Sequence, residues 1–325
     1  MLLLTRDDVR KVLDMADGME AVEKAFAEVA GGTAVLPPRI NLNTPDGLAL
    51  YMPAYLKESG ALACKVVASY KQNPAKHHLP TIPGKVLLQD PATGDVICIM
   101  DGEYLTAVRT GAASGVATKY LARRDRGQTV GIFGAGVQAK AQLWAMVVAR
   151  DIARACVYSR SEESITRFIA EMSSRLNLEI VKADSPGQIL EKADIICTAT
   201  SSPTPVFDGT LVREGTHING VGSHAPDVRE LDTAIIQRAR IVADSYDACL
   251  SEAGDIMIPI REGAIDRSHL SAELGEIITG RKPPRTNDLE ITLFKSNGLA
   301  IQDAATAKLV YDKAIQAGMG TEVSL

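Results

Sequence analysis

The chain has 325 residues and is 46% hydrophobic, so it can bury a sizeable core, and its length suggests roughly two domains. Acidic and basic residues are mixed along it with a net charge of -5 and form no basic stripe, which argues against nucleic acid as a partner. No apolar run reaches the roughly 18 residues of a membrane-spanning helix, and the charged start after Leu4 lacks the long apolar region of a secretory signal, so neither a membrane nor secretion is expected.

The first part of the chain predicts helices mixed with strands. A capping box at Thr5-Arg-Asp-Asp8 predicts the start of a first helix. Residues 18–30 carry apolar side chains at helical spacing and stop at Gly31-Gly32, which predicts a second helix. Strands are predicted at residues 61–70, 85–89 and 96–100, and a further helix at residues 107–122. The polar stretch at residues 123–127 marks the predicted domain boundary.

Beyond this boundary, strands alternate with helices. Strands are predicted at residues 129–133, 155–159, 179–182, 194–199, 217–221 and 240–244, with helices at residues 137–149, 162–176 and 186–192. Such alternation is typical of parallel βαβ units in a doubly wound sheet. A last strand at residues 291–296 precedes a helix at residues 301–317, which we expect to return to the N-terminal domain. The predicted fold class is α/β, with a Rossmann-type doubly wound parallel sheet over residues 123–299 and a mixed α+β domain built from both chain ends, residues 1–122 and 300–325.

A glycine-rich turn, Gly134-Ala-Gly136-Val-Gln-Ala139, follows the first strand of the alternating region. Gly134 permits the tight turn, Gly136 lets the backbone approach a pyrophosphate, and Ala139 allows close packing of helix on strand. The amides of Val137 and Gln138, at the start of the helix, then face the phosphates. The motif alone is weak, but a strand before it and a helix after it favour a dinucleotide site over a turn without a ligand.

The end of the second strand distinguishes between cofactors. NAD enzymes tend to have Asp or Glu there for the ribose hydroxyl, but this chain has Ser159-Arg160-Ser161. A guanidinium with flanking hydroxyls suits a 2′-phosphate, so NADP(H) is the preferred cofactor. NAD(H) stays possible, with Arg160 solvated and Glu162 or Glu163 reaching the ribose.

Cysteine and histidine spacing gives little sign of metal or disulfide chemistry. The five cysteines lie far apart, most of them in apolar strand-like runs, and predict buried reduced thiols in a cytoplasmic protein. The five histidines form no His-Glu-x-x-His or similar ligand pattern, so no metal is expected.

Several segments, taken together, resemble the ornithine cyclodeaminase/μ-crystallin family. They are Pro37-Pro-Arg39, Lys65, Leu79-Pro-Thr81, Met100-Asp-Gly102, Arg109-Thr-Gly-Ala-Ala-Ser114, the Gly134 loop, His217-Ile-Asn219, Arg229-Glu-Leu-Asp232, Phe294-Lys-Ser296, Gly298 and Asp303. They span nearly the whole chain in the family's order. The family includes ornithine cyclodeaminases, archaeal-type alanine dehydrogenases, and ketimine or cyclic-imine reductases. The resemblance implies an NAD(P)-binding Rossmann domain and a second domain that binds substrate and forms homodimers through its sheet.

The resemblance also implies a substrate pocket. Arg39, Lys65 and Arg109 match the family's cationic positions, and Thr81 matches a pocket hydroxyl. A small imino or amino acid carries a carboxylate, which needs cations when it is partly buried. Arg109 has planar donors that fit two oxygens, whereas Lys65 lies in an apolar strand where burial lowers the pKa and allows proton transfer to nitrogen. The alternative for each is a surface or structural charge.

Two positions depart from parts of the family. His224 stands where cyclodeaminases and alanine dehydrogenases have an aspartate, and Leu50 stands where the alanine dehydrogenase pattern has an arginine. Both differences favour reduction of a C=N bond over cyclodeamination. His224 is either a proton donor to the imine nitrogen or a turn residue that shapes the pocket, and Asp227 is a second titratable candidate nearby.

The resemblance places further residues beside the cofactor. They are Thr110, Thr198, Thr200, Val221, Lys295 and Ser296. The sequence thus predicts an NAD(P)H-dependent reductase of cyclic imino acids such as Δ1-pyrroline-2-carboxylate or Δ1-piperideine-2-carboxylate, reversible as an amino-acid dehydrogenase. Alternatives are an ornithine or lysine cyclodeaminase that recycles bound NAD, an alanine dehydrogenase, and a ligand-binding protein without catalysis.

Overall fold

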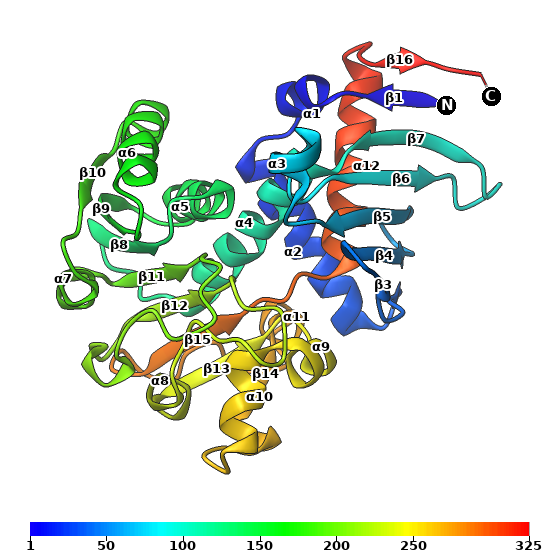
Figure 1. The fold of residues 1–325 in the computed structure, drawn as a ribbon. Coiled ribbons are helices and arrows are strands. Elements are labelled where there is room, and N and C mark those ends of the chain that lie inside the picture. The colour runs from blue at the N-terminus through cyan, green and yellow to red at the C-terminus, as the bar shows by residue number, and fades with distance from the viewer. Residues whose placement is uncertain (325) are drawn as a thin grey trace. The chain divides into compact units, whose positions relative to one another are not determined.

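The computed structural model describes residues 1–324, which form two compact units (Figure 1). Unit 1 contains Met1–Thr110 and the described residues from Leu299 onward, and unit 2 contains Gly111–Gly298. The first division falls inside the helix Gly102–Leu121 (α4), whereas the sequence placed it after that helix, at residues 122–123. The second falls at Gly298 and Leu299, next to the predicted position.

Unit 1 is built on a mixed sheet with the strand order β16-β1-β7-β6-β5-β4-β2, and β3 pairs with β4. The strands are β1 (Leu2–Leu4), β2 (Ala34–Val35), β3 (Ile40–Thr44), β4 (Gly47–Leu56), β5 (Ala61–Ser69), β6 (Gly84–Gln89), β7 (Val96–Asp101) and β16 (Thr321–Glu322). The pairs are antiparallel except for β1 with β7. The helices are α1 (Arg6–Val12), α2 (Met15–Gly31), α3 (Asn73–His77), α12 (Ala300–Gln316) and the first part of α4.

Local signals explain the helices of unit 1. The capping box of α1 is present, since Thr5 Oγ1 accepts from the Asp8 amide and Asp8 Oδ2 accepts from the Thr5 amide. Helix α2 ends where Gly32 takes φ of 75°, which favours glycine. The C-terminal helix α12 packs against α2, β4 and β5, so the chain does return to the N-terminal unit as predicted (Figure 1).

Unit 2 contains a fully parallel sheet with the order β10-β9-β8-β11-β12-β15-β13-β14. The strands are β8 (Gln128–Phe133), β9 (Ile152–Tyr158), β10 (Glu179–Lys182), β11 (Ile195–Thr198), β12 (His217–Gly220), β13 (Ala239–Ala243), β14 (Leu270–Glu273) and β15 (Ile291–Lys295). The helices and short 3-10 turns are α5 (Val137–Ala149), α6 (Glu162–Leu176), α7 (Pro186–Lys192), η1 (Gly209–Leu211), α8 (Thr233–Arg238), α9 (Tyr246–Glu252), α10 (Gly254–Arg261), η2 (Arg267–His269) and α11 (Leu274–Ile278). This is the predicted doubly wound α/β fold. Strand order reverses between β8 and β11, and ligands of such sheets bind beyond the carboxyl ends of the strands at this point.

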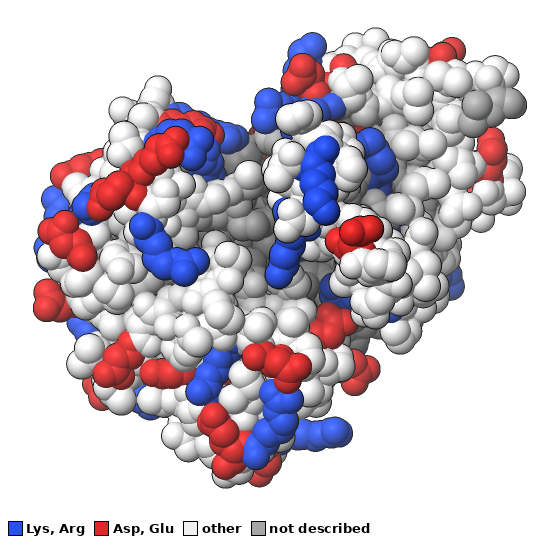
Figure 2. Space-filling view, in the orientation of Figure 1, with Lys and Arg blue, Asp and Glu red and all other residues white. Residues whose placement is uncertain are grey.

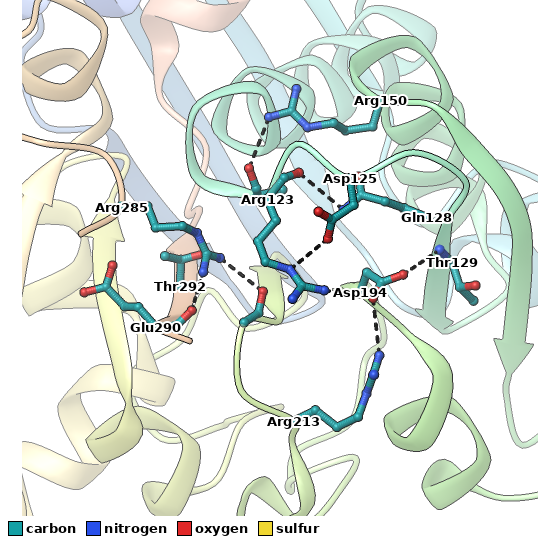
Figure 3. A network of polar contacts seen from close by, with 12 residues as sticks. Arg123, Asp125, Gln128, Thr129, Arg150, Asp194, Arg213, Arg285, Glu290 and Thr292 are labelled. Carbon is teal, nitrogen blue, oxygen red and sulfur yellow. Dashed lines mark hydrogen bonds and ion pairs between the residues drawn. The ribbon is translucent and has the colours of Figure 1, made fainter. Parts of the chain in front are cut away.

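A polar network ties together the opposite, amino-terminal edge of the same sheet (Figure 3). Arg123 pairs with Asp125 at 3.0 Å and with Asp194 at 3.4 Å, and Asp194 accepts from the Thr129 amide at 3.0 Å. Arg285 donates to Thr292 Oγ1 at 3.1 Å and to backbone carbonyls around it. The stretch at residues 123–127 therefore lies inside unit 2 and stabilises it, although the sequence placed a domain boundary there.

The surface carries charged side chains of both signs. On the face shown in Figure 2, basic and acidic side chains are intermixed and form no continuous basic stripe. Within residues 1–324 no helix is both long and apolar enough to cross a membrane. The same residues contain no group of three or more His, Cys, Asp or Glu side chains arranged to hold a metal ion. The five cysteines are unpaired thiols, and four of them are buried.

Candidate active site

The glycine loop of unit 2 follows β8 and leads into α5. Gly134 has φ of 108°, and a Cβ there would lie 2.5 Å from the carbonyl oxygen of Ala199. Both the backbone conformation and the lack of space therefore exclude other residues. Gly136 is the N-cap of α5 in an extended conformation, and a Cβ there would meet nothing within 4 Å. Ala139 is fully buried, whereas Val137 is 68% exposed. The first turn of α5 is thus open on the side where a phosphate can approach its unpaired amides.

A cavity of about 740 Å³ opens next to this loop, between α5 and α6. Its lining consists of Ala135, Gly136, Val137, Lys140, Ser164, Arg167, Ala170 and Glu171. Lys140 pairs with Glu171 and Arg167 pairs with Glu163, so the basic side chains are partly neutralised.

The end of β9 carries the residues that were expected to select the cofactor. Arg160 is exposed there. Ser161 caps α6 by accepting from the Ser164 amide at 3.2 Å. Glu162 pairs with Lys182 at 2.6 Å, which directs this carboxylate toward β10. The arrangement leaves a guanidinium at the end of the second strand, while the nearest predicted competitor, Glu162, is engaged elsewhere.

The loops after β11 and β12 are joined by a buried carboxylate. Glu230 Oε1 accepts from the Thr200 amide at 2.6 Å, and its Oε2 accepts from the Gly222 amide at 2.7 Å. A Cβ on Gly222 would lie 2.4 Å from the Glu230 carboxylate, so a larger residue here would displace this carboxylate from the loop amides. Burial raises the pKa of Glu230 above its ordinary value, although the hydrogen bond from Thr200 opposes this effect. Thr198 is buried, and its Oγ1 has no hydrogen-bond partner among residues 1–324.

Lys295 and Ser296 lie in the interior of unit 2 and do not point outward. Lys295 Nζ contacts Asp255 Oδ2 at 2.8 Å and donates to the Ser223 carbonyl at 2.6 Å, while Ser296 Oγ contacts Asp244 Oδ2 at 3.4 Å. Asp255 also accepts from the Glu230 and Leu231 amides. These side chains support the loops at the carboxyl edge of the sheet.

The loop after β12 holds the two titratable candidates, His224 and Asp227. His224 is exposed, with Nδ1 at 3.1 Å from the Gly222 carbonyl oxygen. Asp227 is also exposed, and Arg261 pairs with it at 3.0 Å. Asp227 is therefore held in a surface ion pair, whereas His224 presents a polar ring at the carboxyl edge of the sheet.

In unit 1, two predicted cations meet around one carboxylate. Lys65 Nζ lies 2.9 Å from Asp303 Oδ1 and 2.8 Å from Oδ2, and Arg109 Nε lies 2.9 Å from the same Oδ1. Arg109 Nη1 also donates to Gln302 Oε1 at 2.6 Å. The three charged residues are 1–5% exposed and come from β5, α4 and α12. We call Lys65, Arg109 and Asp303 the buried triad.

The electrostatics of the triad favour proton exchange at Lys65. Burial lowers the pKa of Lys65 to about 8, and the positive charge of Arg109 acts in the same direction. Asp303 opposes this shift by its charge and its hydrogen bond, and Arg39 adds a smaller lowering effect. An amine with such a pKa both donates and accepts a proton near neutral pH.

Three other predicted site residues belong to unit 1, namely Arg39, Thr81 and Thr110. Arg39 is half-buried between β2 and β3, and its charge acts on Lys65. Thr81 is half-buried, and its carbonyl accepts from the Tyr70 amide at 2.9 Å. Thr110 follows Arg109 on α4 and is buried.

Fold and site together define a two-unit protein with a Rossmann-type dinucleotide crevice and a buried cationic centre. Residues 1–318 match the ornithine cyclodeaminase/mu-crystallin family, and the chain belongs to this family.

Three relatives illustrate the similarity. A Δ1-pyrroline-2-carboxylate reductase from Thermococcus litoralis, solved in complex with NADH and L-proline, has a TM-score of 0.96 and 49% identity, covering 99% of this chain and 100% of that one. An archaeal alanine dehydrogenase dimer with bound NAD has a TM-score of 0.94 and 37% identity, covering 100% and 99%. A Δ1-pyrroline-2-carboxylate reductase from Bacillus cereus is 38% identical over 326 residues, 99% of each chain.

Sequence reasoning missed the carboxylates that organise both parts of the site. Asp303 and Glu230 were noted only as members of matching segments, and Asp255 was not singled out. Each contacts partners distant in sequence, with 238 positions separating Lys65 and Asp303. The one signal in the sequence was an acidic residue among the small apolar residues of α12, as at Asp303. A buried acidic residue needs a positively charged or hydrogen-bonding partner.

Proposed function

We propose that this chain is an NAD(P)H-dependent reductase of cyclic imino acids, with Δ1-pyrroline-2-carboxylate as its first candidate substrate, and that it runs in reverse as an amino-acid dehydrogenase. The buried triad is the observation that carries this proposal. It combines a guanidinium suited to a carboxylate with an amine suited to proton transfer. The similarity to a reductase solved with NADH and L-proline supports the same reaction.

Each residue then has a defined part in the reaction. A nicotinamide cofactor, when bound, would supply the hydride to the imine carbon or take it up from the same carbon of the amine in the reverse direction. Arg109, assisted by Arg39, holds the substrate carboxylate, and Thr81 contributes a hydroxyl to the pocket. The Lys65 ammonium gives a proton to the imine nitrogen and regains one from solvent. His224 is the second candidate donor, and its ring shapes the pocket if Lys65 alone transfers the proton.

The glycine loop and the loops after β9, β11 and β12 would hold the cofactor. The open first turn of α5 and the unpaired Oγ1 of Thr198 fit a dinucleotide with its phosphates at Gly136 and its nicotinamide half near Thr198, Thr200 and Val221. Relatives were solved with NADH and with NAD. We propose that this chain prefers NADP(H), because Arg160 replaces the carboxylate expected for a free ribose hydroxyl.

We further propose that the active form is a homodimer in the cytoplasm. Strands β2 and β3 expose large apolar side chains, with Val35 at 59%, Ile40 at 55% and Leu42 at 50% exposure. Such a patch on a sheet is suited to association. The archaeal alanine dehydrogenase is described as a dimer, and five unpaired thiols accord with a reducing compartment.

Alanine dehydrogenase is the second candidate, since a relative of this activity covers the whole chain. Leu50 occupies the position where the sequence pattern of those enzymes led us to expect an arginine. Cyclodeamination is third, because His224 replaces an aspartate at the position considered above.

A single assay separates these functions. Purified protein is mixed with Δ1-pyrroline-2-carboxylate and either NADPH or NADH, and the absorbance at 340 nm is followed. Rapid loss of absorbance is expected, faster with NADPH. Oxidation of the reduced cofactor with pyruvate and ammonia, but not with the cyclic imine, would identify an alanine dehydrogenase. Ammonia release from ornithine or lysine with catalytic NAD, without imine reduction, would identify a cyclodeaminase.

A further inference from the structure

The carboxylate of Asp303 lies between two buried cations that the proposed reaction needs. It contacts Lys65 Nζ through both oxygens, at 2.9 and 2.8 Å, and accepts from Arg109 Nε at 2.9 Å through Oδ1. Lys65 extends from β5 and Arg109 from α4, whereas Asp303 lies in the first turn of α12. The other charges that act on Lys65 are the cations Arg109 and Arg39, so Asp303 is the carboxylate that balances them.

This arrangement has a clear electrostatic consequence. Two cations of 2% and 5% exposure repel each other strongly in a poorly solvated site, and a carboxylate with hydrogen bonds to both offsets the repulsion. Gln302 accepts from Arg109 on the other side and fixes the plane of the guanidinium. The geometry therefore keeps both cations at a set separation before any substrate carboxylate arrives.

We propose that Asp303 is a positioning residue of the reaction, which holds Lys65 and Arg109 as one unit and keeps the Lys65 ammonium protonated until the proton passes to the imine nitrogen. This inference rests on the proposed function, because it assigns Asp303 a role through Lys65. It extends that function by naming the residue that sets the pH range of catalysis.

The variant Asp303→Asn removes the negative charge and retains the size and one acceptor oxygen. Without this carboxylate, the repulsion between Lys65 and Arg109 favours loss of one proton. Lys65 loses it, because arginine stays charged. The pKa of Lys65 is expected to fall from about 8 by roughly 1–3 units. Reduction of Δ1-pyrroline-2-carboxylate needs the ammonium, and L-proline oxidation needs the amine, so both pH profiles move to lower pH.

The experiment measures kcat/KM across roughly neutral to alkaline pH, on both sides of the Lys65 midpoint, in both directions for the wild type, Asp303→Asn, Asp303→Glu and Asp312→Asn. Asp312 lies on the same helix in a half-buried pair with Lys308, so its variant is a matched control that leaves the profiles in place. Titration of the substrate itself is the same for all four proteins. Asp303→Asn is expected to shift the midpoint of the pH profile by at least about one pH unit. Asp303→Glu keeps the negative charge, so its midpoint is expected to stay close to that of the wild type.

A second readout does not depend on turnover. Lysine labelled with carbon-13 at Cε reports protonation of Nζ by NMR, and Lys65→Met identifies the signal. The proposal requires Lys65 to titrate near pH 8 in the wild type and lower in Asp303→Asn. If Asp303→Asn does not fold, the smaller variant Asp303→Ser is titrated in its place, and a Lys65 midpoint equal to that of the wild type would overturn the proposal.

The reductase function and the role of Asp303 can be refuted separately. A folded Asp303→Asn enzyme that loses activity with an unmoved midpoint would mean that Asp303 serves only packing, while the reductase function stands. A wild-type protein that reduces no imine but shows the Lys65 shift by NMR would remove the proposed function and keep the electrostatic role.

Discussion

Lys65 and Lys295 show how neighbouring charges give two buried lysines opposite properties. Burial and Arg109 lower the pKa of Lys65 to about 8, because a single carboxylate faces it. Burial lowers the pKa of Lys295 as well, but Asp255 at 2.8 Å and Glu230 raise it above its ordinary value overall. The first lysine is suited to exchange protons, and the second is a permanent charge within a structural pair.

Lys295→Met is expected to destabilise the protein by about 3–5 kcal/mol, since it leaves the Asp255 carboxylate buried without a counter-charge. Urea denaturation measures the free energy of unfolding. The control is Lys182→Met, which breaks an exposed pair with Glu162 and should change the free energy of unfolding far less. Equal losses in the two variants would contradict the assigned role of Lys295.

His217 is expected to make the fold sensitive to acid. Burial, helped by the charge of Arg285, lowers its pKa to about 3, so the folded state binds fewer protons than the unfolded state between about pH 6.5 and pH 3. The free energy of unfolding therefore falls as the pH is lowered through this window, by about 1.4 kcal/mol per unit from this one residue. His217→Gln should flatten the acid branch of a plot of unfolding free energy against pH, whereas His77→Gln, at an exposed site, should leave it unchanged.

At the scale of elements, the two glycines before α5 differ in what they contribute. Gly134 has φ of 108° and no room for a Cβ, so Gly134→Ala is expected to lower the melting temperature and abolish cofactor binding. Gly136 has an ordinary extended backbone and open space. Gly136→Ala should keep the melting temperature of the free protein and weaken NADH binding about tenfold or more, because the methyl group occupies space needed by the pyrophosphate. Calorimetric titration with NADH and thermal unfolding test the pair, and a loss of stability in Gly136→Ala would refute the distinction.

The alternating elements of the Rossmann half were predictable from the sequence, but several short helices elsewhere were not. The Rossmann half from β8 to β12 has strands and helices within a few residues of the predicted ranges, since alternation of apolar runs and turn residues is strong there. Helix α4 begins at Gly102 and not at residue 107, because Asp101 accepts from the Tyr104 amide at 2.9 Å and acts as an unrecognised cap. Helices α9, α10 and α11 have five to eight residues, too few for a helical period to be read, and α10 contains Pro259.

The residues of the site also divide into those that the sequence could predict and those that it could not. Local motifs indicated the glycine loop, and the family resemblance indicated Lys65 and Arg109, which the structure brings together. Asp303 and Glu230 act through contacts between distant segments, which no local spacing encodes. Lys295 was predicted beside the cofactor from the resemblance, whereas its ion pair with Asp255, 40 positions away, is a contact that no local spacing encodes.

At the scale of the whole molecule, the apolar patch of β2 and β3 predicts how copies associate. The double variant Ile40→Glu with Leu42→Glu places two charges on this patch and is expected to give a monomer. Size-exclusion chromatography with light scattering measures the mass. Leu211→Glu, at a site of similar exposure in unit 2, is the control and should remain dimeric. A double variant that keeps the mass of two chains would exclude this surface as the interface.

The two ends of the described chain meet in one sheet. Leu2 pairs with Glu322 and Leu3 with Thr321, and the Val323 amide donates to the Met1 carbonyl at 2.9 Å. Unit 1 also requires α12, with Asp303, to cover β5, whereas unit 2 is one continuous stretch of chain. During synthesis on the ribosome, the dinucleotide-binding unit can therefore fold as soon as it has emerged. The N-terminal segment of unit 1 is made before unit 2, but its sheet stays uncovered and Lys65 lacks its counter-charge until α12 has also been made.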